Sequence, residues 1–60
     1  MTVGFLCSML QPYVSVKTYE YGGYSEVRAA ERLTGDKRHI KDFRFLSTGQ
    51  LSIVTEGVEE

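Results

Sequence analysis

A chain of 60 residues with one cysteine and one histidine has to hold its fold together by packing alone. Cys7 has no second cysteine with which to form a disulfide, and Cys7 with His39 cannot supply the four ligands of a structural zinc site. Ordering such a chain costs about 90 kcal/mol, at roughly 1.5 kcal/mol per residue, and so small a domain buries only about 60% of its unfolded surface. We therefore expect one small domain over residues 1–60 that gains stability by forming a homodimer.

The composition is that of a folded protein and gives no overall attraction for nucleic acid. The chain is 42% hydrophobic and 25% charged, which is too apolar for intrinsic disorder, and its formal net charge is −1. The apolar start of the chain has no basic residue before Lys17, unlike a secretory signal, and no run approaches the roughly 20 apolar residues of a membrane span. These features predict a cytoplasmic protein with a reduced thiol and no membrane segment.

Two strands are expected in the first third of the chain. Residues 2–10 are apolar at both alternating sets of positions, which favours a strand covered on both faces, although so brief a run also fits a short helix. Residues 13–21 are rich in β-branched and aromatic side chains and form the clearest strand. Val14, Val16 and Thr18 alternate on the side expected to face the core, and the tyrosines are expected on the half-exposed side. A Gly-Gly step then breaks the strand.

A short amphipathic helix is predicted from Ser25 to Thr34. Ser25 suits the N-cap position, and Gly35 suits the position just after the last turn. At about 100° per residue, the small and apolar side chains fall within one arc and the charged side chains fall on the opposite arc. The inward arc holds Val27, Ala29, Ala30, Leu33 and Thr34, and the outward arc holds Arg28, Glu31 and Arg32.

The last part of the chain predicts a hairpin with strands at residues 40–46 and 51–55. Thr48-Gly49 is a suitable centre for a two-residue turn, because glycine takes the positive φ that such turns need. That turn would set Arg44 opposite Ile53, whereas a bulge at Gly49 would shift every pair.

These elements predict an α+β fold: a small, mostly antiparallel sheet of three to four strands in ββαββ order, with one short helix packed on one face. A single short helix cannot cover four strands. The opposite sheet face therefore needs water-tolerant side chains, a second copy of the chain or a partner protein, which is a second reason to expect a homodimer. Residues 56–60 are expected to form a frayed acidic tail.

No catalytic, metal or cofactor site is expected. A Cys–His nucleophile pair would need Cys7 and His39 in contact, whereas Cys7 is expected to be buried and inert. The serines lie in no nucleophile-elbow pattern, the carboxylates are scattered, and the glycines form neither of the common phosphate-binding loops. The sequence therefore predicts a protein that is not an enzyme.

Basic residues are concentrated in the middle of the chain, and they are the strongest functional signal. Six of the seven lysines and arginines lie between positions 28 and 44. Such a patch can neutralise phosphates or dock on an acidic protein surface, and the alternative is a solvated helix face. The six residues are Arg28, Arg32, Lys37, Arg38, Lys41 and Arg44.

Tyrosines around the end of the second strand are the other functional signal. Tyrosine is enriched in protein interfaces because it combines a large contact area with a polar group, and aromatic rings on an open sheet also stack on single-stranded bases. Packing across the sheet and the helix end is the alternative explanation. The candidate contacts are Tyr19, Tyr21 and Tyr24.

These two surfaces favour a small non-enzymatic interaction protein that binds and modulates a larger protein, as accessory or inhibitory factors of phage or mobile-element type do. The contacts would be the cationic helix face and the tyrosine-bearing sheet face. The alternative is a small dimeric regulator that binds nucleic acid through the basic helix face. No motif is specific enough to indicate a family.

Overall fold

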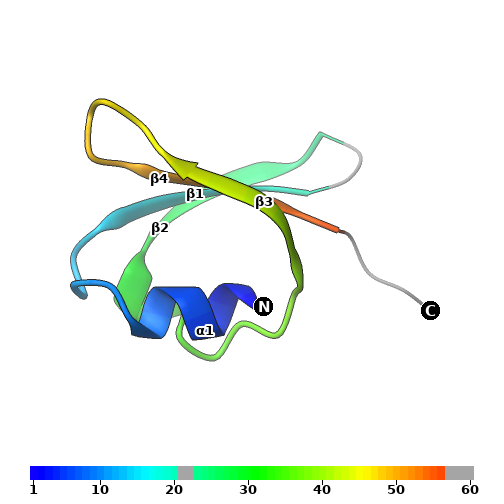
Figure 1. Ribbon diagram of the computed structural model, residues 1–60, viewed down its shortest axis with the longest axis horizontal. Helices are drawn as coiled ribbons and strands as arrows, with labels where there is room; N and C mark the ends of the chain where they lie inside the picture. Colours follow the sequence, from blue (N-terminus) through cyan, green and yellow to red (C-terminus); the bar gives the residue numbers. More distant parts are fainter. Residues whose placement is uncertain (21–22, 57–60) are drawn as a thin grey trace.

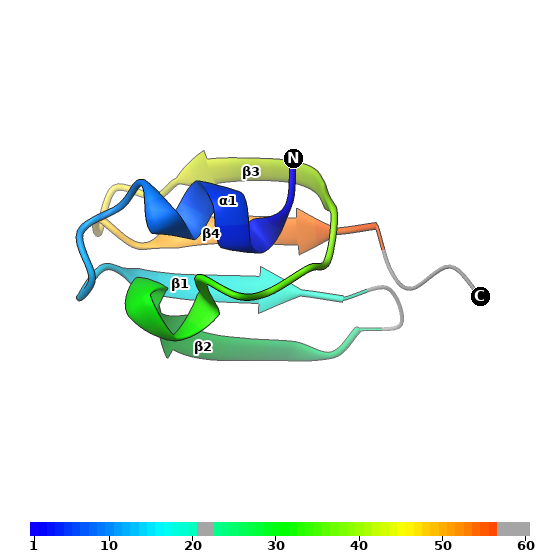
Figure 2. The same cartoon turned by 90° about the horizontal axis from the view of Figure 1, so that it is seen from below.

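The computed structural model describes residues 1–20 and 23–56 as a four-stranded mixed sheet with a short helix and a 3-10 turn on one face (Figures 1 and 2). The predicted α+β class is therefore confirmed, while Tyr21, Gly22 and the tail from residue 57 lie outside the described residues. In chain order the elements are α1 (Val3–Ser8), β1 (Ser15–Tyr19), β2 (Ser25–Ala29), η1 (Ala30–Leu33), β3 (Ile40–Phe45) and β4 (Leu51–Thr55).

The sheet has the strand order β2-β1-β4-β3, with β1 and β4 parallel at its centre. The two outer pairs, β1 with β2 and β3 with β4, are antiparallel. The predicted ββαββ order is therefore not met. Two of the three strand pairs are antiparallel, as expected, but the parallel central pair makes the sheet mixed. β1 and β4 contribute the buried side chains of the sheet because they are its central strands, with a neighbouring strand on each side.

The first segment is a helix, so the strand favoured for residues 2–10 is wrong. The Thr2 hydroxyl accepts a hydrogen bond from the Phe5 N–H at 3.1 Å, which caps the start of α1. Val3, Leu6 and Cys7 face the sheet and are buried, at the three- and four-residue spacing of a helix. Phe5 and Met9 of this run stay exposed, and Leu10 is half-buried against the core, which explains why the run lacked a clear helical period.

The predicted helix at Ser25–Thr34 is also wrong, because its first half is the strand β2. β1 needs an antiparallel partner after the turn at Gly23, which has a φ of 94°, and Ser25–Ala29 supplies five cross-strand positions. A helix of ten residues is marginal on its own, so strand pairing overrides its local propensity. Only η1 turns helically, and its Ala30 and Leu33 are buried, as predicted.

The hairpin β3–β4 exists, but its register differs by one residue from that of a two-residue turn. The Leu46 N–H donates to the Gln50 carbonyl at 2.8 Å, and Gly49 takes a φ of 90°, so three residues form the loop. Arg44 consequently lies opposite Ser52 instead of Ile53. Because side chains alternate, this single step moves Phe43 and Phe45 to the core side and Arg44 to the opposite face.

The core lies between the sheet and the layer formed by α1 and η1 (Figure 2). Val16 and Thr18 of β1 are buried there, as predicted. The buried hydrophobic side chains are Val3, Leu6, Cys7, Val16, Ala30, Leu33, Leu51 and Ile53.

α1 also packs closely against the backbone of the segment that links η1 to β3. The Gly4 N–H donates to the Asp36 carbonyl at 2.9 Å, and the Val3 N–H donates to the Arg38 carbonyl at 2.8 Å. A Cβ atom at Gly4 would lie 2.6 Å from the carbonyl oxygens of Thr34 and Asp36, so only glycine fits there.

Gly4→Ala is therefore expected to destabilise the fold by about 1–3 kcal/mol, even though alanine favours a helix by about 1 kcal/mol. The matched control is Gly35→Ala, because a Cβ atom at Gly35 meets nothing within 4 Å and Gly35 does not have a positive φ. Urea unfolding of both variants measures the difference. Equal unfolding midpoints for the two variants would contradict the close packing at Gly4.

Candidate functional site

The sheet face opposite α1 has no covering layer among the described residues (Figure 1). Each strand places alternate side chains on this open face, as the cross-strand register fixes. Four strands therefore share one exposed surface that mixes charged, aromatic and aliphatic groups. Its main side chains are Lys17 and Tyr19 of β1, Val27 of β2, Asp42 and Arg44 of β3, and Ser52 and Val54 of β4.

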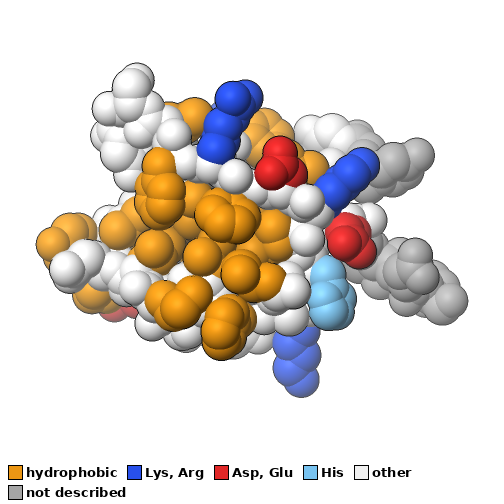
Figure 3. All heavy atoms as spheres, in the orientation of Figure 1, with side chains coloured by type: hydrophobic (Ala, Val, Ile, Leu, Met, Phe, Trp, Pro, Cys, Tyr) orange, Lys and Arg blue, Asp and Glu red, His pale blue; other side chains and the backbone are white. Residues whose placement is uncertain are grey.

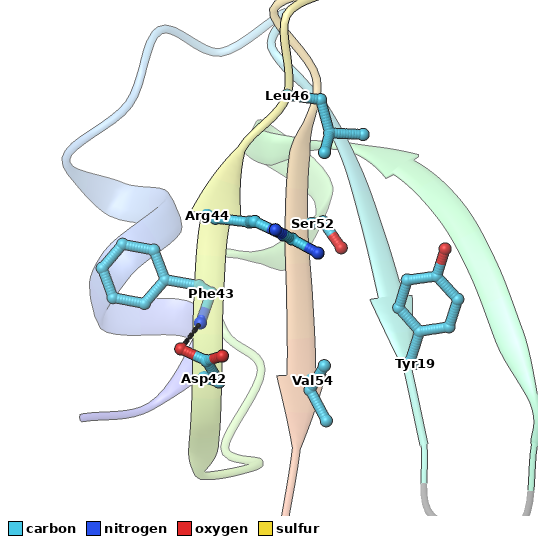
Figure 4. Close-up of a pocket in the computed structure, with 7 residues that line it drawn as sticks. All are labelled: Tyr19, Asp42, Phe43, Arg44, Leu46, Ser52 and Val54. Carbon is cyan, nitrogen blue, oxygen red and sulfur yellow. Dashed lines mark hydrogen bonds between the residues drawn. The ribbon is translucent and has the colours of Figure 1, made fainter.

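A hollow of about 470 Å³ lies on this open face across β1, β4 and β3 (Figure 4). Figure 4 shows Val54 between the Tyr19 ring and β3, with Leu46 at the end of the hollow near the hairpin turn. The Phe43 ring points to the other side of β3. The lining residues are Tyr19, Asp42, Phe43, Arg44, Leu46, Ser52 and Val54.

The hollow combines a cation, Arg44, and a carboxylate, Asp42, with apolar groups that remain partly in water. Arg44 forms no ion pair with any described residue, so its guanidinium is available to an incoming carboxylate. Leu46 and Val54 offer aliphatic surface beside it, and the Lys17 ammonium lies 5.1 Å from the centre of the Tyr19 ring. The arrangement suits a protein segment that carries an acidic side chain next to an apolar one.

The structure does not assemble the predicted cationic helix face, because residues 25–29 are a strand. Arg28 lies opposite Val16, on the side of the sheet that faces α1, and pairs with Glu26 at 2.9 Å. Arg32 in η1 and Lys37 in the following loop are exposed. Lys41 lies at the irregularity between Ile40 and Asp42 at the start of β3. Arg44, on the opposite face and the far outer strand, is separated from Arg28 by the width of the sheet.

Arg38 is part of an internal ion cluster instead of a binding face. Its guanidinium donates to Asp36 through two nitrogens and to Glu20 at 2.6 Å, and its side chain is only 19% exposed. The hydrogen bond from Arg38 holds the pKa of the Asp36 carboxyl below its usual range, and the same pair raises the pKa of Arg38. These bonds tie the loop before β3 to the end of β1.

The three predicted tyrosines do not form one described surface. Tyr19 lines the hollow together with Arg44, so two of the predicted contacts meet there. Tyr24 is exposed just before β2, where its carbonyl accepts the Glu20 N–H at 2.7 Å. Tyr21 lies outside the described residues.

A second exposed surface, which sequence reasoning missed, lies where α1 meets β3. We call it the α1–β3 surface. Figure 3 shows hydrophobic side chains gathered over the region that α1 and β3 occupy in Figure 1. Phe5 is 58% exposed, Met9 59% and Phe45 55%, which is high for such large apolar groups. The surface consists of Met1, Phe5, Met9, Phe43 and Phe45.

The reactive side chains form no cluster in the part of the chain that the structure describes. Cys7 is 1% exposed, and burial, together with the nearby Asp36 charge, raises the pKa of its thiol. Within residues 1–20 and 23–56, no three histidine, cysteine, aspartate or glutamate side chains are placed to hold a metal ion. No helix among these residues is long and apolar enough to cross a membrane.

Comparison of the chain with protein-family models, with curated proteins and with solved structures finds no match.

Arg38→Met is expected to lower the free energy of unfolding by about 2 kcal/mol, because it leaves the Asp36 carboxylate, only 14% exposed, without its main partner. Lys37→Met is the matched control: Lys37 is the adjacent exposed cation and forms no ion pair with a described residue, so a change within about 0.5 kcal/mol is expected. Urea unfolding at neutral pH measures both. A mild effect at both positions would show that the cluster does not hold the loop.

The lowered pKa of Asp36 also predicts how stability depends on pH. The stabilisation is complete above the ordinary aspartate pKa of about 3.9 and is lost as the pH falls through the lower folded value. The unfolding free energy of the wild type should therefore fall more steeply between about pH 5 and pH 2 than that of Asp36→Asn. Parallel curves for the two proteins would show that this carboxylate is not stabilised by folding.

Proposed function

We propose that this chain is a small non-enzymatic interaction protein that binds and modulates a larger protein through the hollow on its open sheet face. The observation that carries the proposal is the junction of a guanidinium without an ion pair among the described residues, Arg44, with the partly exposed Tyr19, Leu46 and Val54. Interfaces are typically built this way, with arginine and aromatic anchors beside aliphatic contacts. An accessory or inhibitory factor of phage or mobile-element type works by occupying a surface in this manner.

A protein partner suits the hollow better than a small molecule does. The hollow lies on an outer sheet face, so a small ligand there would keep one side in water, whereas binding pockets bury most of their ligand. A protein surface would cover the open face and exclude water from the Arg44 contact. The partner's contribution is an acidic side chain for Arg44 and an apolar one for Val54.

The nucleic-acid alternative has less support from the side-chain arrangement. Arg28 is paired with Glu26, and Arg38 is paired with Asp36 and Glu20, so these guanidinium groups already have carboxylate partners. The other predicted cations are divided among η1, the loop after it and β3, which holds Lys41 and Arg44, and they form no continuous stripe that could follow a phosphate backbone. Strong retention on heparin at low salt, lost by Arg32→Ala with Lys37→Ala, would restore this alternative.

The proposal includes a homodimer in the cytoplasm. A cytoplasmic location fits the free thiol of Cys7, which stays reduced in that compartment. The homodimer is supported by the exposed α1–β3 surface, which is separate from the open sheet face on which Arg44, Tyr19 and Val54 lie.

The binding site is tested by two matched substitutions on the open face. Val54→Arg fills the hollow with a long cation, and Val27→Arg places the same side chain on the outer strand β2 of the same face, outside the hollow. Affinity purification with the wild type identifies a stoichiometric partner, and titration calorimetry then compares the variants. We expect Val54→Arg to weaken binding at least about tenfold, or ~1.4 kcal/mol, and Val27→Arg to bind as the wild type does. Equal affinities for the two variants would refute the hollow as the binding site.

A further inference from the structure

β3 is an outer strand whose free edge is partly covered by the N-terminal residues. The Ile40 N–H donates to the Met1 carbonyl at 2.9 Å, and Thr2 bridges His39, so the first part of the edge is occupied. Among residues 1–20 and 23–56, no further segment pairs with the rest of this edge, from Lys41 to Phe45. An uncovered edge strand is a template for pairing with another strand.

The hydrogen-bond register of the hairpin fixes which backbone groups of β3 point away from the sheet. The Leu46 N–H bonds to Gln50, so the backbone groups of Leu46, and of Arg44 and Asp42 at every second position, face β4. The N–H and C=O groups of Phe43 and Phe45 therefore point away from the sheet. Consistent with this, the Phe43 N–H has no strand partner and donates to the Asp42 carboxylate at 2.9 Å (Figure 4).

We infer that a second copy of this chain pairs with the free edge, so that two β3 strands run antiparallel about a two-fold axis at Phe43. This inference rests on the homodimer of the proposed function and specifies its interface. Pairing over residues 41–45 sets Phe43 opposite Phe43 of the second copy, and their outward backbone groups exchange two hydrogen bonds. The two sheets then join into one with eight strands.

The charges of β3 select this register. With Phe43 on the axis, Asp42 lies opposite Arg44 of the second copy, and Arg44 lies opposite its Asp42, at the positions where side chains approach most closely. Because a guanidinium has five N–H donors, Arg44 can still bind a carboxylate of the larger partner. A shift to the next bonding register would place Asp42 opposite Asp42 in one direction and Arg44 opposite Arg44 in the other. Like charges directly opposite each other are unfavourable, so the sequence Asp-Phe-Arg is self-complementary in one register only.

The same pairing would cover the α1–β3 surface. α1 lies over β3 and β4 (Figure 2), so with strands about 4.8 Å apart the two copies of α1 would lie roughly 10 Å from each other. This is the distance at which helices pack, and it brings the exposed Phe5 and Met9 of both copies into the gap. A whole phenylalanine has roughly 200 Å² of surface, so the exposed parts of Phe5, Phe43 and Phe45 together offer about 300 Å². Each partner in a stable complex buries about 800 Å², so these three rings would supply over a third of that area.

Asp42 has an alternative role that would contradict the inference. By accepting the Phe43 N–H, its carboxylate could serve only to cap the edge and prevent pairing. In that case, removing the carboxylate would promote association. If instead Asp42 turns to Arg44 of the second copy, reversing its charge weakens association, so one substitution separates the two roles.

The test is a charge exchange in the full-length chain, followed by sedimentation equilibrium over a wide concentration range. We expect the wild type to dimerise, and Asp42→Arg and Arg44→Asp each to weaken the dimer at least about tenfold, because each places like charges opposite one another. The double variant Asp42→Arg with Arg44→Asp restores opposite charges and should recover wild-type association. Circular dichroism confirms that each variant is folded, and Val27→Arg on the other outer strand controls for added charge.

Three results would overturn the inference: a wild type that stays monomeric, a dimer unaffected by either single exchange, or stronger association of Asp42→Arg. Tyr19→Ala separates this inference from the proposed binding of a larger protein, because Tyr19 lines the hollow from β1, two strands away from the free edge, whereas Val54 lies directly opposite Asp42. That variant should remain dimeric while losing the larger partner. A monomeric wild type that still binds its partner through Tyr19 would refute the dimer and leave the proposed function intact.

Discussion

The arrangement of this protein depends on the close contact between α1 and the backbone of residues 34–38. The contact leaves no room for a side chain at position 4, where the residue is Gly4. Arg38 pairs with Asp36 in the same loop and with Glu20 at the end of β1, and so ties the loop to the sheet. The contact holds a helix of six residues over the core, and together with the four-residue turn η1 this helix forms the only layer on the described sheet. With so little helical material, the described residues leave one sheet face and the edge of β3 from Lys41 to Phe45 uncovered.

These two uncovered surfaces hold part of the exposed apolar side chains of this small chain, whereas Phe5 and Met9 belong to α1 and its C-cap. Alternation along β3 gives each of its sides a distinct character: Asp42 and Arg44 on the open face, and Phe43 and Phe45 on the side of α1. A single short strand therefore contributes both to the hollow proposed for a larger partner and to the edge inferred to pair with a second copy.

Much of the fold could be predicted from local patterns, but the pairing of its strands could not. The β-branched alternation around Val16 and Thr18 predicted a core strand, and both residues are buried. The segment 25–34 carried every local helix signal, yet β1 required an antiparallel neighbour, and no local rule contains that requirement. The sequence singles out Tyr19 and Arg44 as candidate contacts. Their position in one hollow, on either side of Val54, depends on the hairpin register, and one extra loop residue moves Arg44 to the opposite sheet face.

Hydrogen exchange of the outward backbone amides tests the central claim, that the free edge of β3 binds protein, most directly. The backbone amides of Phe43 and Phe45 point away from the sheet at the β3 edge. The amide of Val27 points away from the sheet at the opposite edge, on β2, and serves as an internal reference. With rising protein concentration, the account predicts slower exchange at Phe43 and Phe45 and constant exchange at Val27. Exchange at Phe43 and Phe45 that matches Val27 at every concentration would contradict it.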